Sequence, residues 1–363
     1  MPSLTLHQRL GAGTMGTVYR GELRTDGGIN RRVAVKVLTA HEEMGGQLEE
    51  RLRDEARLLG LLADELIVGV ADLVRLDGHW AVVMDLVHGA DLAEIAAVGP
   101  IPGRALAELG AEVAGALYRA HQARHEGAPL GVVHRDIKPG NIMVTSLGGV
   151  RLLDFGVARA AFANREARTV GLVLGTLNYL APETIAGDPP TPAVDVFGLG
   201  QTLWEAATGR SWGPPVPSRE RFETRVQDHM ARLPSGAEAL GSVLRQMVQW
   251  DPGLRPDASA LEHALLRAAS SIKGPGLRTW ARNVVPGVLT RRAVSETDDW
   301  VGRSWVLGAV EPHTVRPVSR SVQTSSGLNT TRVAVGVIVG VGCGTAAVVA
   351  CSMCLAVVVW SLS

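Results

Sequence analysis

The sequence predicts an α+β protein with two lobes, a strand-rich first lobe and a helix-rich second lobe, followed by one membrane-spanning helix. Three observations lead to this. β-type runs and glycine turns dominate residues 4–86, helical periodicity dominates residues 90–270, and an uncharged apolar run covers residues 333–360. Strands and helices that are segregated along a chain are typical of α+β proteins rather than of alternating βαβ units.

Glycine turns and β-branched residues define the first lobe. A single helix is expected between its strands, where leucine and alanine recur at helical spacing. The expected elements are strands at residues 4–10, 16–23, 31–38, 67–76 and 80–84 and a helix at residues 49–62.

Helices make up most of the second lobe, and a different kind of segment follows it. The expected helices are at residues 104–124, 193–208, 238–249 and 257–268. Residues 271–332 mix Ser, Thr, Pro and both signs of charge without clean periodicity, which predicts a flexible juxtamembrane linker. Trp280, Trp300 and Trp305 argue against full flexibility, because aromatic side chains favour a surface on which to dock.

Composition limits the classes of function. The 363 residues contain 36 Lys and Arg and 36 Asp and Glu, so no excess of positive charge points to a nucleic acid partner. All 3 cysteines lie inside the apolar run, which leaves the rest of the chain without disulfides or thiolate metal sites and suits a reducing compartment. The first residues lack a basic-then-apolar pattern, so we expect no signal peptide.

The first lobe contains a glycine motif and a lysine that fit a nucleotide. Gly11, Gly13 and Gly16 have the G-x-G-x-x-G spacing, which dinucleotide-binding folds share. In those folds a helix follows, whereas "TVYRGEL" favours a strand here, so the turn can cover phosphates from between two strands. Lys36 in "VAVK" lies among valines and is expected to point into a cleft, with Glu55 as its partner.

The second lobe contains a dense polar cluster. The segment "HRDIKPGNIMV" places Asp136, Lys138 and Asn141 between apolar runs, and "LLDFGVA" places Asp154 shortly after it. Buried ionisable clusters are costly, so such a cluster indicates function. Two carboxylates, an amide and a lysine fit phosphoryl transfer, in which a carboxylate orients a hydroxyl and cations oppose the developing charge.

Together these motifs resemble the protein kinase family. "GAGTMGTV", "VAVK", "HRD", "DFG" and "APE" occur in that order between Leu6 and Ala268. The resemblance implies a bilobal kinase domain at residues 4–270, with ATP and Mg²⁺ or Mn²⁺ as cofactors. Lys138 and Thr176 resemble the serine/threonine class, whose substrates are protein hydroxyls, and "IKPGNIMV" resembles the eukaryotic-like kinases of bacteria.

The resemblance also implies a role for each matching residue. Asp136 acts as the catalytic base, Lys138 steadies the transferred phosphoryl group, Asn141 and Asp154 hold the metal, and Lys36 binds the α- and β-phosphates. The other positions implied for ATP are Leu10, Gly11, Gly13, Gly16, Val18, Ala34, Glu55, Met84, Asp85, Val87, Asp91 and Met143. The scaffold roles implied are a pair between Glu183 and Arg255 and a brace from Asp195 to the catalytic loop.

Regulation is predicted at Thr169, the only hydroxyl residue between Gly156 and Thr176. A phosphate on Thr169 is expected to pair with Arg135 and order the loop. The alternative is an ordinary exposed threonine. Thr176 is a competing site, although it is expected to contact the substrate.

The apolar run predicts a membrane anchor. It exceeds the ~20 residues that a spanning helix needs, and Arg316, Arg320 and Arg332 precede it. This predicts a kinase tail-anchored in the cell (inner) membrane, with its catalytic domain in the cytoplasm; the alternative is a core or oligomerisation element. Gly336, Gly340 and Gly344 make G-x-x-x-G steps that favour a homodimer, or reflect only the frequency of glycine in such helices.

A pseudokinase is the rival hypothesis from another class: a nucleotide-binding scaffold at the membrane that recruits partners without catalysis. Such a protein is expected to have lost the lysine, the base or the metal-binding aspartate. Lys36, Asp136 and Asp154 are all present, which favours an enzyme.

Overall fold

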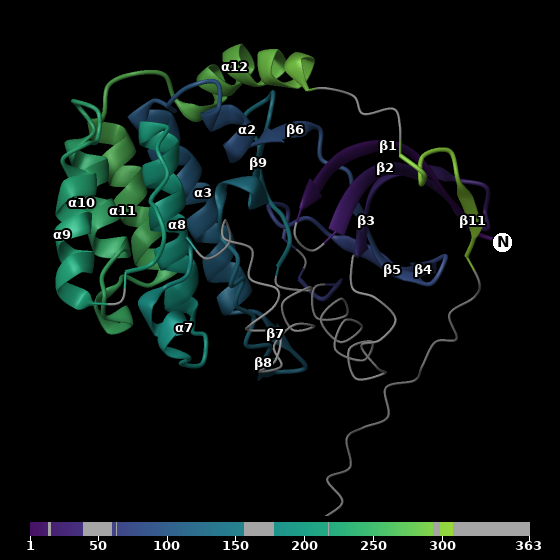
Figure 1. Ribbon diagram of the computed structural model, residues 1–363, viewed down its shortest axis with the longest axis horizontal. Helices are drawn as coiled ribbons and strands as arrows, with labels where there is room; N and C mark the ends of the chain where they lie inside the picture. Colours follow the sequence, from purple (N-terminus) through teal and green to yellow (C-terminus); the bar gives the residue numbers. More distant parts are fainter. Residues whose placement is uncertain are drawn as a thin grey trace, which may run out of the picture. The chain divides into compact units, whose positions relative to one another are not determined.

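The structure is a computed structural model that describes residues 1–13, 16–38, 60–62, 64–155, 178–216, 218–292 and 298–307 (Figure 1). All of these residues belong to one compact unit, residues 1–309. Residues 310–363 form a separate unit and lie outside the described residues.

An antiparallel six-stranded sheet forms the first lobe, with the strand order β11-β1-β2-β3-β5-β4 (Figure 1). Its strands are β1 (Ser3–Gly13), β2 (Gly16–Arg24), β3 (Asn30–Leu38), β4 (Val70–Leu76), β5 (His79–Asp85) and β11 (Ser304–Val306). The first five match the strands predicted from the sequence. The sixth comes from the far end of the chain.

The two faces of this sheet carry different apolar clusters because side chains alternate along each strand. On one face Val33, Val35 and Val37 of β3 pack with Leu4, Leu6 and Tyr19. On the other face Ala34 packs with Val82 and Met84. The second face is the one on which adenine was expected, so the sheet presents a preformed apolar wall there.

The helical lobe packs around three central helices. They are α3 (Gly103–His121), α8 (Pro192–Thr208) and α11 (Ala258–Ser271). Further helices are α2 (Leu92–Ala96), α7 (Pro182–Ala186), α9 (Arg219–Met230), α10 (Glu238–Met247) and α12 (Leu277–Arg291), with short 3₁₀ turns at Pro139–Asn141 and Pro252–Leu254. The four helices predicted for this lobe are confirmed as α3, α8, α10 and α11.

Short strands complete the second lobe. β6 (Gly89–Asp91), β9 (Ile142–Thr145) and β10 (Val150–Leu152) make a three-stranded sheet in the order β10-β9-β6. β7 (Arg124–His125) and β8 (Ala128–Pro129) form an exposed hairpin. The sheet matters for the site because it connects the two polar motifs. β9 follows Asn141 directly, and β10 ends two residues before Asp154.

Local sequence explains where several helices begin and end. The side chains of Asp91, Ser218 and Asp257 accept hydrogen bonds from backbone N–H groups in the first turns of α2, α9 and α11. Gly187 and Gly209 follow α7 and α8 in the left-handed conformation that glycine adopts without strain.

The expectation of a flexible tether at residues 271–332 is wrong for the residues that the structure describes. α12 buries Trp280, Ala281, Val285 and Val288, and residues 304–306 form β11. The buried positions recur every three to four residues, which is a helical pattern that the sequence analysis overlooked. Burial of this apolar face supplies the stabilisation that a tether lacks.

Two sequence-based predictions fall outside the described residues. They are the membrane-spanning helix at residues 333–360 and most of the helix at residues 49–62. Within the part of the chain that the structure does describe, none of the helices has the length and apolar character that crossing a bilayer demands.

Candidate active site

Asp195, in the first turn of α8, holds the predicted catalytic loop, residues 134–141. Its carboxylate accepts hydrogen bonds from the backbone N–H of His134 at 2.8 Å and of Arg135 at 2.7 Å, and contacts His121 Nε2 at 2.9 Å. Gly198, one turn later, allows α8 to approach closely, because a Cβ there would lie 2.9 Å from the carbonyl oxygen of Ile137. The predicted brace from Asp195 is therefore present.

His134 is buried and neutral, and its tautomer follows from its two partners. Nε2 donates to the carbonyl oxygen of Leu153 at 2.8 Å, and Nδ1 accepts from the backbone N–H of Asp136 at 3.2 Å. Burial lowers the pKa of the His134 imidazole, although the carboxylates of Asp195 and Asp136 oppose this. The neutral ring thus ties the catalytic loop to the strand that leads to Asp154.

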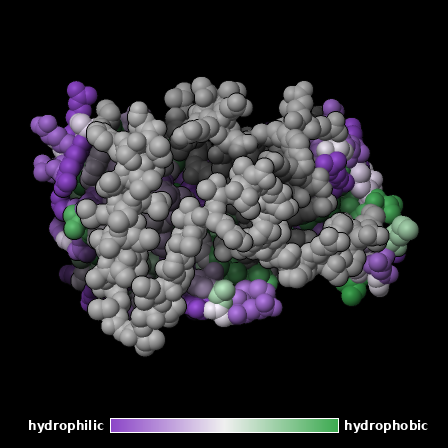
Figure 2. Space-filling model, turned by 90° about the horizontal axis from the view of Figure 1, so that it is seen from below, coloured by the Kyte–Doolittle hydropathy of each residue, from purple (hydrophilic) through white to green (hydrophobic). Residues whose placement is uncertain are grey.

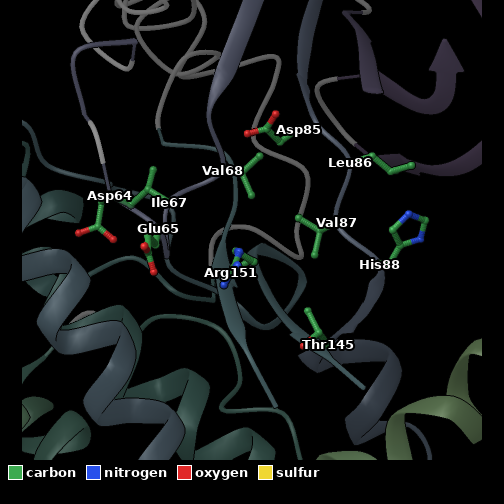
Figure 3. Close-up of a pocket in the computed structure, with 10 residues that line it drawn as sticks. All are labelled: Asp64, Glu65, Ile67, Val68, Asp85, Leu86, Val87, His88, Thr145 and Arg151. Carbon is green, nitrogen blue, oxygen red and sulfur yellow. The ribbon is translucent and has the colours of Figure 1, made fainter. Parts of the chain in front are cut away.

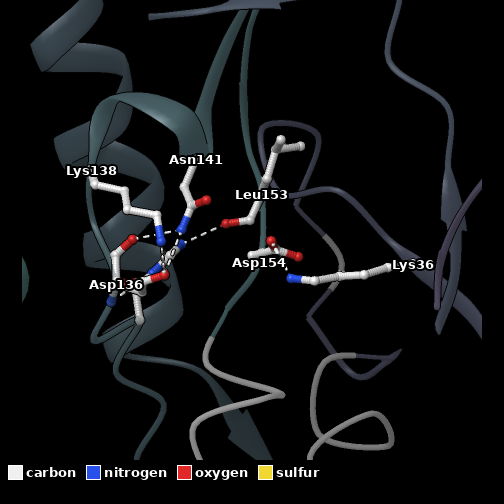
Figure 4. A network of polar contacts seen from close by, with 7 residues as sticks. Lys36, Asp136, Lys138, Asn141, Leu153 and Asp154 are labelled. Atoms are coloured by element: carbon white, nitrogen blue, oxygen red, sulfur yellow. Dashed lines mark hydrogen bonds and ion pairs between the residues drawn. The ribbon is translucent and has the colours of Figure 1, made fainter. Parts of the chain in front are cut away.

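The predicted base lies at the centre of a small polar network (Figure 4). Lys138 Nζ donates to Asp136 Oδ2 at 2.7 Å, and Asn141 Nδ2 donates to the same oxygen at 3.0 Å and to the Asp136 backbone oxygen at 2.7 Å. In Figure 4 the side-chain oxygen of Asn141 points away from these contacts. The three residues predicted for catalysis and metal binding in this loop are therefore adjacent.

Lys36 extends from β3 toward Asp154 and meets it across the site (Figure 4). The distance from Nζ to Asp154 Oδ2 is 2.6 Å, and both side chains are at least two-thirds buried, with 12% and 32% exposed. Leu153 N donates to the carbonyl oxygen of Asn141 at 2.8 Å, which joins the Asp154 segment to the catalytic loop. Glu55, the partner predicted for Lys36, lies outside the described residues.

Two residues of the site adopt the left-handed backbone conformation that side chains disfavour. Arg135 has a φ of 64° and Asp154 a φ of 54°. Each such residue costs about 1–2 kcal/mol. The contacts of Asp195 with the Arg135 backbone and of Lys36 with Asp154 hold these conformations, so the strain is located where the polar groups converge.

Several residues predicted to contact the nucleotide lie together on one face of the sheet in the first lobe. Ala34 and Met84 are buried, with Val18 and Leu86 packed against them, and Met143 is half-buried on β9. Gly16 has a φ of 151°, and a Cβ there would lie 2.1 Å from the Val37 carbonyl oxygen. Only glycine fits that close approach. Gly11 and Gly13 have open space beside them.

Asp91 has a structural role that the sequence analysis did not assign. It is the N-cap of α2: its side chain accepts from the Glu94 N–H at 2.9 Å, and its own N–H donates to Glu94 Oε2 at 3.1 Å. Burial raises the Asp91 pKa to about 6, although the backbone N–H of Glu94 opposes that effect. The ribose contact implied for Asp91 stays a prediction.

A cavity of about 390 Å³ lies beside residues 85–88 (Figure 3). Asp85 and Val87, whose backbones were predicted to bind adenine, line it together with Thr145 and Arg151. Val18, Ala34, Lys36 and Asp154 do not line it, so the cavity meets the predicted nucleotide site only at residues 85–87. Asp85 also pairs with Arg31 of β3, a contact that no local pattern in the sequence predicts.

Glu183 and Arg255 form the predicted scaffold pair. Two hydrogen bonds of 2.6 and 2.8 Å join the guanidinium to the carboxylate, and the two side chains are 0% and 8% exposed. Arg255 also donates to three backbone carbonyl oxygens and lies 4.7 Å from the centre of the Phe197 ring. The pair connects α7 to the segment before α11.

Three predicted site residues are outside the described part of the chain, namely Glu55, Thr169 and Thr176. Within the described part, His, Cys, Asp and Glu side chains form no cluster of three or more that could hold a metal. Mg²⁺ prefers six oxygen ligands, so a metal at Asp154 and Asn141 would take further oxygens from water or from the phosphates of a nucleotide.

A strand-rich lobe over a helical lobe, with a lysine–aspartate pair and an Asp-Lys-Asn network between them, is the architecture of a protein kinase. The protein kinase domain family model matches residues 4–266. The chain therefore belongs to the protein kinase family.

Named relatives agree with this assignment. The chain is 36% identical over 282 residues to the serine/threonine-protein kinase PkaA of Streptomyces coelicolor. The alignment covers 74% of this chain and 50% of PkaA. It is 34% identical over 272 residues to the serine/threonine-protein kinase Pkn1 of Myxococcus xanthus, in an alignment that covers 73% of this chain and 35% of Pkn1. The chain thus spans half or less of the length of these relatives.

Solved structures show the same fold. The kinase domain of PknI from Mycobacterium tuberculosis superposes with a TM-score of 0.55 at 26% sequence identity. The superposition covers 74% of this chain and 96% of that domain. The bilobal kinase fold predicted from the motifs is therefore confirmed.

Proposed function

We propose that this chain is a serine/threonine protein kinase that transfers the γ-phosphoryl group of ATP to hydroxyl groups of proteins. The observation that carries the proposal is the convergence of Asp136, Lys138 and Asn141 on one side of the site with the Lys36–Asp154 pair on the other. Serine/threonine kinases among the relatives, and Lys138 two residues after the base, support the choice of hydroxyl.

The residues present fit a nucleotide and a divalent metal. A carboxylate on Asp154 and an amide oxygen on Asn141 are the hard oxygen ligands that Mg²⁺ and Mn²⁺ prefer. Val18, Ala34 and Met84 offer an apolar wall for a purine, and Lys36 offers a cation for phosphates. A bound divalent metal neutralises charge on the β- and γ-phosphates during transfer.

The chain's own groups supply positioning and one proton acceptor. Asp136, fixed by Lys138 and Asn141, accepts the proton of the attacking substrate hydroxyl. Lys138 Nζ, 2.7 Å from Asp136, places a positive charge beside the transferred group as negative charge develops there. Lys36 orients the α- and β-phosphates. The oxygen–phosphorus bond to the substrate forms as the bond to the nucleoside diphosphate breaks.

Phosphate transfer from labelled ATP to a generic protein substrate tests the proposal in the full chain. Asp136→Asn is expected to reduce the rate by about 10²- to 10⁴-fold, the usual contribution of a general base. Asp188→Asn, which neutralises an exposed aspartate of the same lobe, is the matched control and is expected to retain full activity. A wild-type chain that binds ATP without transferring phosphate contradicts the proposal and supports the pseudokinase.

We also propose, from the sequence alone, that residues 333–360 anchor the chain in the cell membrane with the kinase domain in the cytoplasm. The support is the length of the uncharged run and the arginines before it. Protease added to the outside of intact spheroplasts is expected to spare the kinase domain. Its digestion there contradicts the orientation, and recovery of the chain in the soluble fraction contradicts the anchor.

A further inference from the structure

Residues beyond the kinase family match, which ends at residue 266, contact both lobes (Figure 1). α12 packs against α2, α3, β6 and β9 of the helical lobe. β11 begins at Ser304, 13 positions after Arg291, the last residue of α12, and extends the sheet of the first lobe. We call residues 277–292 and 298–307 together the C-terminal strap.

The strap is anchored at the helical lobe by Arg292. Its Nε and Nη2 donate to the two carboxylate oxygens of Glu94 at 2.9 and 2.6 Å, and Nη2 also donates to the Gly89 carbonyl oxygen at 3.2 Å. Glu94 is the capping partner of Asp91 at the start of α2. The first anchor therefore stabilises the segment that carries the predicted ribose contact.

The strap is anchored a second time at the edge of β1, where β11 pairs with it. Ser3, Leu4 and Thr5 pair with Val306, Trp305 and Ser304 in antiparallel register. Leu307 is buried in the apolar cluster of that lobe, and Trp300 and Trp305 pack against the cluster. Trp305 Nε1 also donates to Asp77 in the turn between β4 and β5 at 2.8 Å. Residues 298–307 of the strap thus contribute to the core of the first lobe.

Asp298 holds the hairpin that carries the glycine-rich turn. The Tyr19 hydroxyl donates to its carboxylate oxygens at 2.9 and 3.0 Å, and Arg9 Nη1 lies 3.7 Å from Oδ2. Arg9 and Tyr19 are cross-strand partners on β1 and β2. Burial, together with the Asp298 carboxylate, raises the Tyr19 pKa to about 12, so the hydroxyl remains a donor at neutral pH.

This contact lies on the opposite side of the sheet from the face predicted to bind the nucleotide. Tyr19 packs in the apolar cluster that contains Val33 and Val35. Its neighbour Val18 packs against the cluster on the other face, where the nucleotide is predicted to bind. Arg292 and Asp298 are six residues apart, so their Cα atoms are at most about 20 Å apart. A short length of chain therefore joins the start of α2 to the base of the glycine-rich turn.

We propose that the strap positions the glycine-rich hairpin over the nucleotide, with Asp298 as the positioning residue. The inference rests on the proposed kinase function. It assigns residues 277–292 and 298–307 to the catalytic unit, and it places the effect of Asp298 on nucleotide affinity rather than on phosphoryl transfer.

Steady-state kinetics of the full chain separate the two effects. Asp298→Asn keeps the side-chain oxygen that accepts from Trp300 N but removes the charge that faces Tyr19 and Arg9. It is expected to raise KM for ATP about 3- to 10-fold, as the loss of one charge-assisted hydrogen bond does, with kcat changed less than about twofold. Asp299→Asn neutralises the exposed neighbouring carboxylate and is the matched control with unchanged KM.

Tyr19→Phe removes the other half of the contact and keeps the ring in the core. It is expected to raise KM for ATP as Asp298→Asn does, and the double variant is expected to show no further rise, because the two changes remove one interaction. If Asp298→Asn does not fold, KM for ATP of Tyr19→Phe alone tests whether the contact affects nucleotide affinity.

Two results overturn the inference: equal KM values for Asp298→Asn and Asp299→Asn, or a lowered Tm for Asp298→Asn with unchanged KM. The dissociation constant of ATP, measured in the same variants, separates this inference from the proposed function. A wild-type chain that binds ATP without transferring phosphate refutes the kinase activity, and the ratio of dissociation constants then tests the strap by itself. A wild-type chain that binds no ATP refutes both.

Discussion

The Glu183 carboxylate and the Arg255 guanidinium form a bidentate ion pair that is almost completely removed from solvent. Removing one partner of such a pair leaves the other charge buried, which costs about 3–5 kcal/mol. We therefore expect Glu183→Ala to lower the Tm of the chain strongly. Glu223→Ala, which breaks the exposed pair with Arg219, is the control and is expected to leave the Tm almost unchanged. Equal melting curves for the two variants would refute the stabilising role of the buried pair.

Asp154→Ala is expected to abolish phosphate transfer while the chain stays folded, because it removes a proposed metal ligand and the partner of Lys36. Activity with labelled ATP over a range of Mg²⁺ and Mn²⁺ concentrations measures the first effect, and circular dichroism measures the second. Normal transfer by this variant contradicts the proposed metal site.

Acid is expected to destabilise the fold through His134. Burial lowers its folded-state pKa below the ordinary value of 6.5, so the unfolded chain binds this proton more readily. The contribution of the neutral ring is complete above about pH 6.5 and is lost as the pH falls below that value. Urea midpoints between about pH 7 and about pH 5 measure this.

The comparison for that experiment is His134→Gln, which cannot titrate. The stability advantage of the wild-type chain over His134→Gln is expected to shrink toward about pH 5. His125→Gln, at an exposed histidine, is the control. An advantage that does not change with pH means that His134 does not titrate as proposed.

Asp91 is expected to have the opposite pH dependence. Its pKa in the folded chain is raised from 3.8 to about 6, so the folded state holds this proton more tightly than the unfolded state. Its contribution to stability is complete below about pH 4 and is lost as the pH rises through about 6. Asp91→Asn retains a capping oxygen without titrating. Its stability relative to wild type is expected to rise by on the order of 2 kcal/mol between about pH 4 and about pH 7; parallel curves would exclude this.

We expect the proposed membrane helix at residues 333–360 to pair with a second copy and so to promote phosphorylation of Thr169. Two tethered kinase domains share a small volume, which raises their effective concentration toward the millimolar range. Replacing Gly336 and Gly340 by Leu is expected to keep membrane insertion and to reduce Thr169 phosphorylation at equal expression. Mass spectrometry of membrane-extracted protein measures it. Unchanged phosphorylation leaves the tail without a role in dimerisation.

Much of the active site could be predicted from the sequence because its residues occur in short contiguous motifs. Asp136, Lys138 and Asn141 lie within six positions, and local turns hold them together in the structure. The long strands and helices were also predictable, since each shows its own periodicity. The prediction that Glu183 pairs with Arg255 is confirmed, but it followed from the family resemblance and not from local periodicity.

The strap could not be predicted in the same way. β11 is only three residues long, and its partner β1 lies about 300 positions earlier in the chain, so no local pattern marks the pairing. Pro286 lies inside α12, where proline argues against a helix even though the apolar spacing continues past it. The link from Asp298 to Tyr19 depends on that tertiary arrangement, as does the ion pair of Arg292 with Glu94.

The pairing of β1 with β11 brings the beginning and the end of the described kinase unit together, and Leu307 N donates to the Pro2 carbonyl oxygen at 2.9 Å. The unit is therefore suited to circular permutation. A short linker from residue 307 to residue 1, with new termini opened in the exposed turn at Glu126 and Gly127, interrupts only the short β7–β8 hairpin among the strand pairings described above. For the same reason the whole unit can be inserted into a surface loop of another protein without separating its lobes.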